Sequence, residues 1–287
     1  EDEMDALRLC REVVSHLNWN KPEKNIEEVP EEPVYDSEEL LGLVSKDLKT
    51  PFDIKEAIAR FSDGSRFEEF KPLFGSSIVC GWTHVHGYPV AIIGNNGAIY
   101  PDSSQKAAHF IQLCNKINTP IIFLQNVTGF LVGKEFERDG SIKKGSQLIN
   151  AVSNSTVPHI TIILGASYGA GTYAMSGRAF NNRFTFIWPS AKIAVMGGKQ
   201  IAGVMSLVRR ARAMRKGEKF NEEEDKQIVA AVEKLQEDGS RALEATGLVS
   251  DDGIIDPRDT RTVIGMCLSI VGNKPIKGTK EFGVFRL

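Results

Sequence analysis

The sequence predicts an α/β fold of mainly parallel strands, on three observations. Short uncharged runs rich in β-branched residues, such as residues 121–124 and 160–164, have the composition of strands buried on both faces. Stretches with apolar residues at helical spacing alternate with these runs along the chain. A glycine-bearing loop follows each of the two runs, as expected where a parallel strand turns into a helix. At 287 residues the chain is long enough to bury a sizeable core.

The N-terminal part of the chain is expected to divide into a helix and a linker. Residues 4–17 carry five apolar side chains on one helical face, and nothing before them supplies a partner for that face. Residues 21–33 contain three prolines and a dense run of glutamates, a composition typical of an exposed linker. We therefore predict a terminal helix within residues 1–20, a linker over 21–33 and one domain over 34–287.

The predicted domain opens with a helix and a hairpin. Asp53 is placed to cap a helix over residues 54–61, and the spacing of Ser65 and Glu68 is that of a capping box. Two β-rich runs between residues 77 and 94 flank a short glycine turn, which predicts a hairpin. The remaining elements alternate between helix and strand: a helix capped by Asp102 or Ser103, a strand at 120–125, a helix at 143–154, a strand at 160–164, a helix ending at Ser176, strands at 184–188 and 192–196, and a helix at 197–210.

Composition and charge argue against several classes of function. The net charge of -2 provides no general electrostatic attraction to nucleic acid, so we predict no nucleic-acid partner. The four cysteines are widely spaced, as expected of structural thiols in a reducing compartment. Residues 1–5 resemble neither a signal peptide nor a transit peptide, and the uncharged stretch at 117–133 is interrupted by polar residues and a proline. No membrane span is predicted.

Residues 165–177 form a glycine-rich stretch directly after the uncharged run at 160–164. A strand, a glycine turn and a helix start in this order point backbone N–H groups at the mouth of the sheet, where the helix dipole favours negative charge. A second glycine loop at residues 125–133 follows the strand at 121–124. Two such loops at one sheet edge can bring two N–H donors to one developing oxyanion. The alternative is that these glycines only permit turns and close helix packing.

Five motifs follow one another along the chain. They are FLQNVTGFLVGKE at residues 123–135, SYGAGTY at 167–173, WP at 188–189, VMGG at 195–198 and DDGIIDP at 251–257. Together they resemble the carboxyltransferase subunit of biotin-dependent acyl-CoA carboxylases, and within that group the C-terminal half of the β subunit of methylcrotonoyl-CoA carboxylase. The resemblance runs from about Asp5 to Leu287 and implies a crotonase-like (ClpP/crotonase) fold of repeated ββα units.

The resemblance implies a mechanism for the chain. In this family a biotin carried on another chain brings its carboxyl group to a short or branched acyl-CoA such as 3-methylcrotonoyl-CoA, and no side-chain nucleophile is required. Negative charge develops on the ureido oxygen of biotin and on the thioester oxygen, and each oxygen needs preorganised donors. By the resemblance, the residues on the biotin side are the backbone donors Phe130 and Ala170, together with Gly129, Gly169, Gly171 and Thr172.

The resemblance also implies partners that this chain does not contain. A full carboxyltransferase subunit has an N-terminal domain of the same fold that holds most of the CoA, so the chain resembles half of an enzyme. The family forms dimers that build a hexamer with biotin carboxylase and biotin carrier subunits, in the mitochondrial matrix of eukaryotes or the cytoplasm of bacteria. The sequence has no Met-Lys-Met biotin attachment site and no Walker-type phosphate loop, so carrier and ATP-using functions are expected on other chains.

Three alternatives compete with this function. A crotonase-type hydratase or isomerase needs a carboxylate near the thioester, and residues 165–177 contain no Asp or Glu, which argues against that chemistry. A biotin-dependent acyl-CoA decarboxylase would share nearly every motif, and a non-catalytic partner subunit would keep the fold alone. Residues 165–174 read GASYGAGTYA where GGSYGAGNYG is expected of methylcrotonoyl-type subunits, which leaves the acyl-chain preference open.

Three further groups of side chains have simpler explanations. His84 and His86 have strand spacing, but no carboxylate or cysteine cluster completes a metal site, so we expect hairpin packing and no metal. Six basic residues between positions 209 and 219 can attract CoA phosphates or an acidic partner, yet they are more typical of a solvated helix end. Four aspartates between positions 251 and 259 can be interpreted as an acid/base group, but Asp256 before a proline favours a turn and a helix cap.

Overall fold

A mixed sheet forms the centre of the molecule. The computed structural model describes residues 2–15, 29–45, 50, 52–180 and 182–283. The strands within these residues are β1 (Glu68–Glu69), β2 (Ile78–Val85), β3 (Tyr88–Asn95), β4 (Ile121–Val127), β5 (His159–Tyr168), β6 (Phe184–Ile187) and β7 (Lys192–Ala194). In this described part the seven strands make one sheet in the order β1-β2-β3-β4-β5-β6, with β7 paired to β5.

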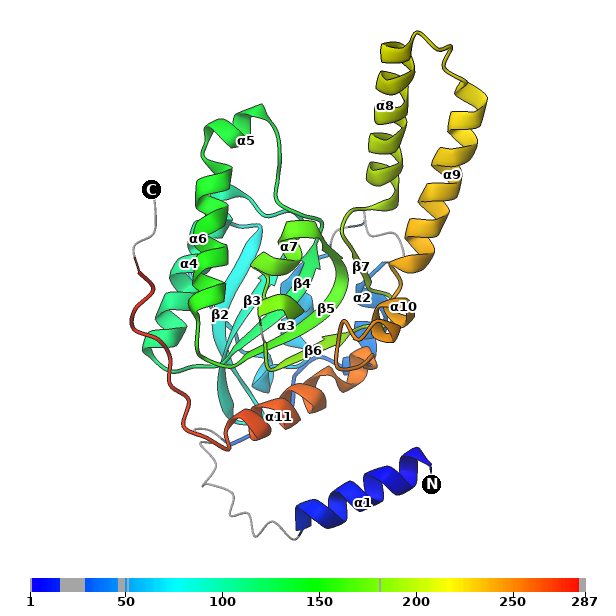
Figure 1. Ribbon diagram of the computed structural model, residues 1–287. Helices are drawn as coiled ribbons and strands as arrows, with labels where there is room; N and C mark the ends of the chain where they lie inside the picture. Colours follow the sequence, from blue (N-terminus) through cyan, green and yellow to red (C-terminus); the bar gives the residue numbers. More distant parts are fainter. Residues whose placement is uncertain (1, 16–28, 46–49, 51, 181, 284–287) are drawn as a thin grey trace.

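Helices follow most of the strands and cover both faces of the sheet (Figure 1). Those in the described residues are α1 (Glu3–Ser15), α2 (Leu40–Leu43), α3 (Ile54–Ala59), α4 (Pro101–Lys116), α5 (Lys134–Arg138), α6 (Ser141–Asn154), α7 (Gly169–Ala174), α8 (Gly198–Lys216), α9 (Glu222–Gly239), α10 (Ala242–Gly247) and α11 (Thr260–Val271). The prediction of an α/β fold is therefore confirmed. The predicted helix after Asp53 is also confirmed, because the Asp53 carboxylate accepts a hydrogen bond from the N–H of Lys55 at 3.0 Å.

The hairpin predicted between residues 77 and 94 is confirmed by the antiparallel pairing of β2 with β3. His86 and Gly87 make its turn with φ angles of 51° and 75°. The Asp63 carboxylate accepts hydrogen bonds from both turn N–H groups, at 2.9 Å from His86 and 2.7 Å from Gly87. Arg261 of α11 donates to the same carboxylate. The turn is therefore fixed against α11.

The strands β3, β4, β5 and β6 pair in parallel, and β7 is parallel to β5. Consecutive residues of β4 alternate between two cores. Ile122 and Leu124 pack with α3 and α11, while Ile121 and Phe123 pack with α4 and α6, and all four are 0% exposed. The strand is thus covered on both faces, as its uncharged sequence predicted. Because the strands are parallel, their carboxyl ends lie at one edge of the sheet.

Several predicted local features are wrong. Ser65 and Glu68 do not form a capping box, because Ser65 ends a short 3₁₀ turn with a φ of 55° and Glu68 begins β1. Neither Asp102 nor Ser103 caps α4, which begins with the proline before them, and the Asp102 carboxylate accepts from the N–H of Ser103 instead. The strand β5 continues to Tyr168, so residues predicted to form a glycine turn extend the sheet.

The helix predicted at residues 4–17 is present as α1 through Ser15, and none of its residues is buried. The end of that prediction and residues 21–28 of the predicted linker lie outside the described residues. In the remainder of the linker, Glu31 is exposed and binds Arg66 at 2.7 Å. The domain boundaries stay predictions. No helix of the described chain has both the length and the apolar composition needed to cross a membrane.

The helices α8 and α9 form a helical hairpin that projects away from the sheet (Figure 1). The helix α8 runs to Lys216, past the end predicted at residue 210. Among the described residues of the hairpin, Ala202 in α8 and Asp225 in α9 are the buried ones. Arg209 donates to the Asp225 carboxylate at 2.8 Å, so polar bonds join the two helices.

Candidate functional site

Two glycine-rich elements meet at the carboxyl ends of β4 and β5. The first is the loop at residues 128–133, which follows β4, and the second is the start of α7, which follows β5. A Cβ atom added to Gly171 would lie 2.5 Å from Cγ2 of Val127 and 3.2 Å from Cα of Gly129. Only glycine permits so close an approach. The structure thus brings together the two loops that the sequence placed at one sheet edge.

Gly169 and Gly129 have backbone conformations that favour glycine. Gly169 has a φ of 57°, which turns the chain from β5 into α7, and an added Cβ there would lie 3.0 Å from the carbonyl oxygen of Val195. Gly129 has a φ of 130°, although an added Cβ would meet nothing within 4 Å. A side chain at Gly129 would therefore strain the backbone, whereas a side chain at Gly171 would displace α7.

Phe130 and Ala170 carry the two N–H groups predicted as donors. A parallel bridge joins Phe130 to Ile99: the Ile99 N–H donates to the oxygen of Gly129, and the Leu131 N–H donates to the oxygen of Ile99, both at 3.0 Å. This pattern directs the Phe130 N–H away from Ile99. Ala170 is exposed in the first turn of α7, which has no side-chain cap. Neither N–H has an acceptor among the residues that the structure describes.

Thr172 is the remaining predicted site residue, and it faces the interior. Its Oγ1 lies 2.9 Å from Oγ of Ser167, and its carbonyl oxygen accepts from the Gly177 N–H at 2.8 Å. The hydroxyl of Thr172 is thus engaged inside the protein at the base of α7. Of the five other predicted residues, Gly171 and Gly129 form the contact between the two glycine-rich elements, and the remaining three are their neighbours in the sequence.

Two asparagines that sequence reasoning did not single out join the strand ends. Asn95, the last residue of β3, donates from Nδ2 to the oxygens of Gly97 and Asn126, both at 2.7 Å, and accepts from the Asn126 N–H at 2.9 Å. Oδ1 of Asn126 accepts from the N–H of Ala166 in β5 at 3.2 Å. The signal in the sequence is an amide side chain at the end of each of the runs that become β3 and β4. These bonds fix the ends of β3, β4 and β5 relative to one another.

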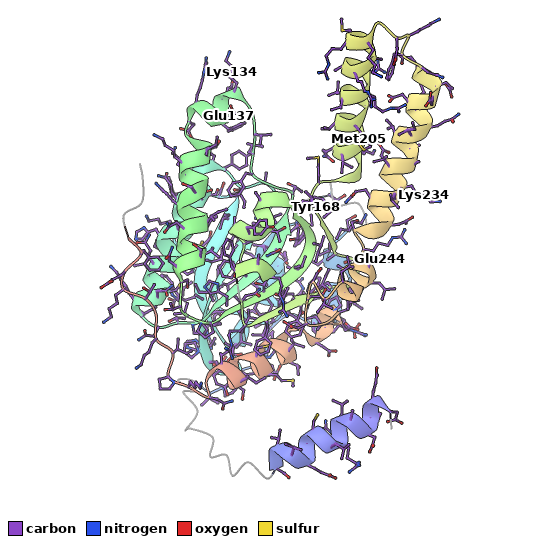
Figure 2. All side chains as sticks on the ribbon, in the orientation of Figure 1. Lys134, Glu137, Tyr168, Met205, Lys234 and Glu244 are labelled. Atoms are coloured by element: carbon purple, nitrogen blue, oxygen red, sulfur yellow. The ribbon has the colours of Figure 1, made fainter. Side chains whose placement is uncertain are left out.

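Tyr168 lies between the glycine-rich elements and the foot of the α8–α9 hairpin (Figure 2). It is the last residue of β5 and pairs with Ala194 of β7. Burial and the Glu237 carboxylate of α9 raise the pKa of Tyr168, so its hydroxyl stays neutral and able to donate. Lys192 of β7 bonds to Glu237. The base of the hairpin is therefore attached to the strand beside the candidate site.

The two histidines take part in packing rather than in a ligand cluster. The ring of His86 lies against Gly265 of α11, where an added Cβ would collide with it, so the predicted hairpin packing is confirmed for this residue. Burial lowers the pKa of His86, which favours the neutral ring. His84 contributes to a pocket on the other side of the molecule. In the described parts of the chain, no three His, Cys, Asp or Glu side chains are grouped as metal ligands.

The basic residues and the aspartates are engaged in local structure. Arg210 donates two hydrogen bonds of 3.1 Å to Glu222, within the α8–α9 hairpin. The Asp256 carboxylate accepts from the N–H of Arg258 at 2.9 Å and caps the turn before α11. The predicted cap at Asp256 is confirmed. Within the basic cluster, Arg209 and Arg210 are paired with acidic residues of α9, in agreement with a solvated helix end.

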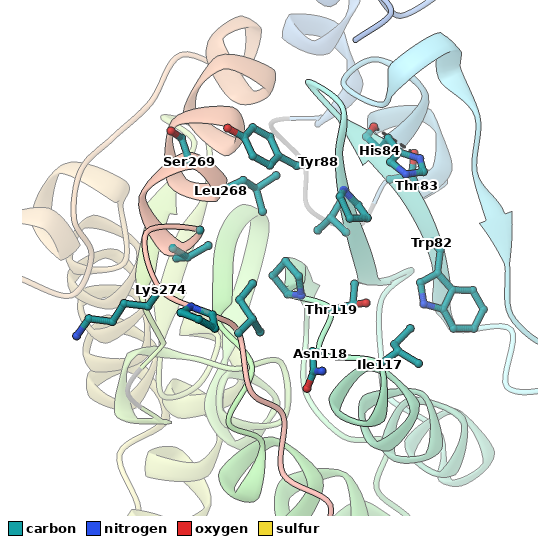
Figure 3. Close-up of a pocket in the computed structure, with 17 residues that line it drawn as sticks. Trp82, Thr83, His84, Tyr88, Ile117, Asn118, Thr119, Leu268, Ser269 and Lys274 are labelled. Carbon is teal, nitrogen blue, oxygen red and sulfur yellow. Dashed lines mark hydrogen bonds between the residues drawn. The ribbon is translucent and has the colours of Figure 1, made fainter. Parts of the chain in front are cut away.

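A pocket of about 570 Å³ lies at the opposite edge of the sheet (Figure 3). The end of β2, the start of β3, the residues before β4 and the end of α11 line it, with Trp82, Tyr88, Thr119 and Leu268 among the lining side chains. Because β3 and β4 begin here and the glycine-rich elements follow strand ends, the sheet separates the pocket from those elements. None of the six predicted site residues lines it.

The chain is similar to known carboxyl transferases along its whole length. The carboxyl transferase domain model matches residues 1–285. The probable biotin-dependent acyl-coenzyme A carboxylase beta2 subunit of Mycobacterium tuberculosis is 56% identical over 287 residues, which are 100% of this chain and 54% of that protein. The mitochondrial methylcrotonoyl-CoA carboxylase beta chain of Dictyostelium discoideum is 44% identical over 288 residues, which cover 100% of this chain and 49% of that protein.

A solved structure extends this similarity to the fold. The beta subunit of geranyl-CoA carboxylase from P. aeruginosa matches with a TM-score of 0.83 and 44% identity, over 99% of this chain and 54% of that one. This match confirms the expected crotonase-like fold, in which β2, β3 and α4 form one ββα unit. The chain spans about half the length of the relatives it matches. Because the domain model covers nearly every residue, the chain belongs to the carboxyl transferase domain family.

Proposed function

We propose that this chain forms the biotin side of the carboxyltransferase site in a biotin-dependent acyl-CoA carboxylase. The observation that carries the proposal is the contact of Gly171 with Val127 and Gly129, which puts the Phe130 and Ala170 N–H groups on touching backbone segments. Family membership supports it, as do the names of the relatives, which are carboxylase beta chains. The activity of the complete enzyme belongs to the proposal, because the chain spans about half of those relatives.

The donor set fits the ureido carbonyl of biotin. That carbonyl offers an acceptor oxygen, and the glycine-rich elements offer N–H groups that have no acceptor within the described residues. No Asp or Glu occurs between residues 165 and 177, so no fixed negative charge of this segment opposes a developing oxyanion. When bound, carboxybiotin supplies the carboxyl group that is transferred to the acyl-CoA.

The residues of the chain act through their backbone in this proposal. The N–H groups of Ala170 and Phe130 donate to the ureido oxygen and stabilise the negative charge that it gains. A donor of this kind typically contributes about 10²–10³ in rate. Gly171 and Gly129 keep the two donors on adjacent segments, and the bonds of Thr172 at the base of α7 hold the helix start in place.

We propose a short or branched acyl-CoA, such as 3-methylcrotonoyl-CoA, as the carboxyl acceptor. Relatives named for methylcrotonoyl-CoA and geranyl-CoA support a branched acyl group and leave its length open. The family resemblance assigns most CoA contacts to an N-terminal domain, and this chain matches about half of each relative. We therefore place the CoA-binding wall on polypeptide outside these 287 residues.

Exposed apolar side chains support assembly with other subunits. On α1, Leu7, Val13 and Val14 are 55%, 63% and 61% exposed. On α8, Leu207 and Val208 are 68% and 59% exposed. Apolar groups gathered on a helix face mark contact surfaces. We propose dimers that build a hexamer with biotin carboxylase and biotin carrier subunits, in the mitochondrial matrix for a eukaryotic source and in the cytoplasm for a bacterial one.

Labelled carboxyl transfer tests the proposal. The protein in its native assembly is mixed with radiolabelled carboxybiotin and a panel of short, branched and long acyl-CoA esters, and in a parallel reaction with a labelled malonyl-type CoA ester. We expect label in a short or branched ester. The proposal is wrong if the intact assembly transfers no label from carboxybiotin to any ester and removes none from a labelled ester.

Two alternatives predict other outcomes in the same assay. A biotin-dependent decarboxylase would release label from a malonyl-type CoA ester and would carboxylate no ester from carboxybiotin. A non-catalytic partner subunit would support assembly, and transfer would continue unchanged after substitution of Gly171, because the reaction would take place elsewhere.

A further inference from the structure

Gln125 is a buried amide whose backbone and side chain belong to different parts of the site. Its backbone lies in β4, the strand that leads into the loop of Gly129 and Phe130. Its side chain is 0% exposed and reaches across to β5 and α7. Nε2 donates to the carbonyl oxygen of Met175 at 2.7 Å, and Oε1 accepts from the Ser167 hydroxyl at 2.6 Å. The side chain therefore joins one glycine-rich element to the other.

The hydrogen bonds of this network have one consistent direction. Nε2 of Gln125 also lies 3.5 Å from the carbonyl oxygen of Thr172, and two carbonyls on that side fix the orientation of the amide. The Ser167 hydroxyl gives its one hydrogen to Oε1. The Thr172 hydroxyl, 2.9 Å from Oγ of Ser167, must then donate to Ser167. The network thus holds α7 at Thr172, within the helix, and just past its end, at Met175.

The strand ladder alone does not fix α7 relative to β4. The two strands are in register as far as the pair Gln125 and Ile163, but the next pair is Val127 with Ser167. Between these two pairs β4 has one residue and β5 has three, so the ladder is irregular where the strands approach the site. The Gln125 side chain bridges this irregular stretch.

We propose that Gln125 is a positioning residue for carboxyl transfer, a role that rests on the proposed function. Its bonds set the spacing between the backbone donor that follows β4 and the backbone donor at the start of α7. Gln125 touches neither reacting group and acts through its partners in β5 and α7. Loss of these bonds is expected to leave the fold intact and to let Ala170 move relative to Phe130.

Three substitutions probe the network in different ways. Gln125→Met keeps the side-chain length and leaves its buried polar partners unpaired. Gln125→Glu keeps an acceptor for Ser167 but turns an ionised oxygen toward the carbonyl of Met175, and protonation of this buried carboxyl restores a donor there. Ser167→Ala removes the hydroxyl that donates to Oε1 of Gln125 and links it to Thr172, while the bond from Nε2 to Met175 remains. It serves if Gln125→Met does not fold.

Asn115→Leu is the matched control. Asn115 is also 0% exposed and lies in the last turn of α4. Its Nδ2 donates to the carbonyl oxygen of Ile111 at 2.9 Å and to Oγ of Ser155 at 2.8 Å. Ser155 precedes β5, so this buried amide network lies at the edge where the parallel strands begin, away from the glycine-rich elements.

Amide hydrogen exchange and steady-state kinetics are measured on the protein in its native assembly. Gln125→Met is expected to speed exchange over residues 127–131 and 171–177 about tenfold. It should lower kcat about tenfold, with KM for the acyl-CoA within about twofold. Ser167→Ala should lower kcat about threefold. In exchange and in kcat, Gln125→Glu should match Gln125→Met at about pH 8. Both quantities should recover toward the wild type at about pH 6, because the carboxyl takes up a proton.

The Asn115→Leu control shows whether Gln125 positions the backbone donors or only contributes to packing. Asn115→Leu is expected to lower thermal stability without speeding exchange over residues 127–131 and without lowering kcat. Residues 171–177 are the less independent segment, because Ser155 bonds to His159 and His159 bonds to Ser176. The inference is wrong if Asn115→Leu and Gln125→Met give the same exchange in both segments, or if Gln125→Glu shows no recovery at low pH. If the wild type transfers no carboxyl group and Gln125→Met still loosens both segments, the proposed function fails and the structural coupling by Gln125 stands.

Discussion

The glycine-rich elements at the ends of β4 and β5 and the α8–α9 hairpin are held by different forces. Around the glycine-rich elements the hydrogen bonds join neutral groups such as Gln125 and Ser167, which are both 0% exposed. In each described hairpin helix one residue is buried, and the bonds between the helices are largely ion pairs, such as that of Arg210 with Glu222. The contrast indicates that the site depends on fixed backbone positions, whereas the hairpin tolerates change.

The two kinds of bond respond differently to substitution and to salt. A buried polar group left unpaired costs about 1–3 kcal/mol, and salt screens such neutral bonds little. Exposed ion pairs contribute about 0–1 kcal/mol and weaken as salt rises. Substitutions beside the site should therefore have larger effects than substitutions in the hairpin, and only the latter should depend on ionic strength.

The largest effect on stability is expected from protonation of His159. Its ring nitrogens lie 2.9 Å from Oγ of Ser176 and 2.8 Å from Oγ of Ser155, and burial lowers its pKa from 6.5 to about 4. The unfolded chain takes up a proton as pH falls through 6.5, whereas the folded ring stays neutral down to about pH 4. The stabilising contribution is therefore complete above about pH 6.5 and is lost toward pH 4, by about 3 kcal/mol in total.

Chemical denaturation at a series of pH values measures this loss. His159→Asn removes the titrating ring, so the difference in unfolding free energy between the wild type and the variant should change between about pH 6.5 and 4 and be constant outside that window. A difference that stays constant over the whole range would show that the ring is accessible to protons in the folded protein.

Gly171→Ala is expected to lower kcat/KM for carboxyl transfer about a hundredfold. The added Cβ would collide with Val127 and move α7 away from Gly129. The fold should persist, because overpacking of this kind costs about 1–3 kcal/mol. Transfer rates and circular dichroism are measured together. A folded variant with an unchanged rate would mean that the contact between the two glycine-rich elements does not position the donors.

Asp225→Asn is expected to destabilise the hairpin by about 1 kcal/mol, because it weakens the bond to Arg209, whose side chain is 31% exposed and screened by solvent. Hydrogen exchange should increase over residues 198–239 alone, and the difference from the wild type should shrink as salt rises. Glu222→Gln, at an exposed pair, is the control with little effect. If hydrogen exchange increased equally at the glycine-rich elements, the contrast between the two regions would be wrong.

Gly203→Ala should give the smallest change in stability, and it should stabilise the protein rather than destabilise it. An added Cβ at this position in α8 meets nothing within 4 Å. Replacing glycine by alanine inside an exposed helix typically adds about 0.5–1 kcal/mol of stability. Thermal unfolding should therefore show a slightly higher Tm. A lower Tm in the native assembly would place this face of α8 in a tight contact with another subunit.

The sequence predicts the elements that local pattern determines. The run before Gly129 becomes β4 because every residue from Ile121 to Leu124 can be buried on one face or the other. The hairpin follows from a glycine that accepts the φ of 75° at its turn. The cap of α4 is predicted wrongly because residue type alone favours Asp102 and Ser103, while the proline before them begins the helix.

The bonds that fix the candidate site arise from tertiary structure. The partners of Gln125 lie 42 and 50 residues away, at Ser167 and Met175, and Asn126 bonds to Ala166 across 40 residues. No periodicity or spacing in the sequence connects such distant positions. The bonds of Ser167 and Ala166 join β5 to β4 beyond the run at residues 160–164, and β5 continues as far as Tyr168. The glycines were found because their backbone requirements are local, whereas the side chains that place them were not.

A structure of the native assembly with biotin bound tests the proposed site most directly. We predict that the ureido oxygen of biotin lies about 2.7–3.1 Å from the backbone nitrogens of both Phe130 and Ala170. Biotin held in the pocket beside Trp82, or along the α8–α9 hairpin, with neither of these two contacts, would contradict the proposed site.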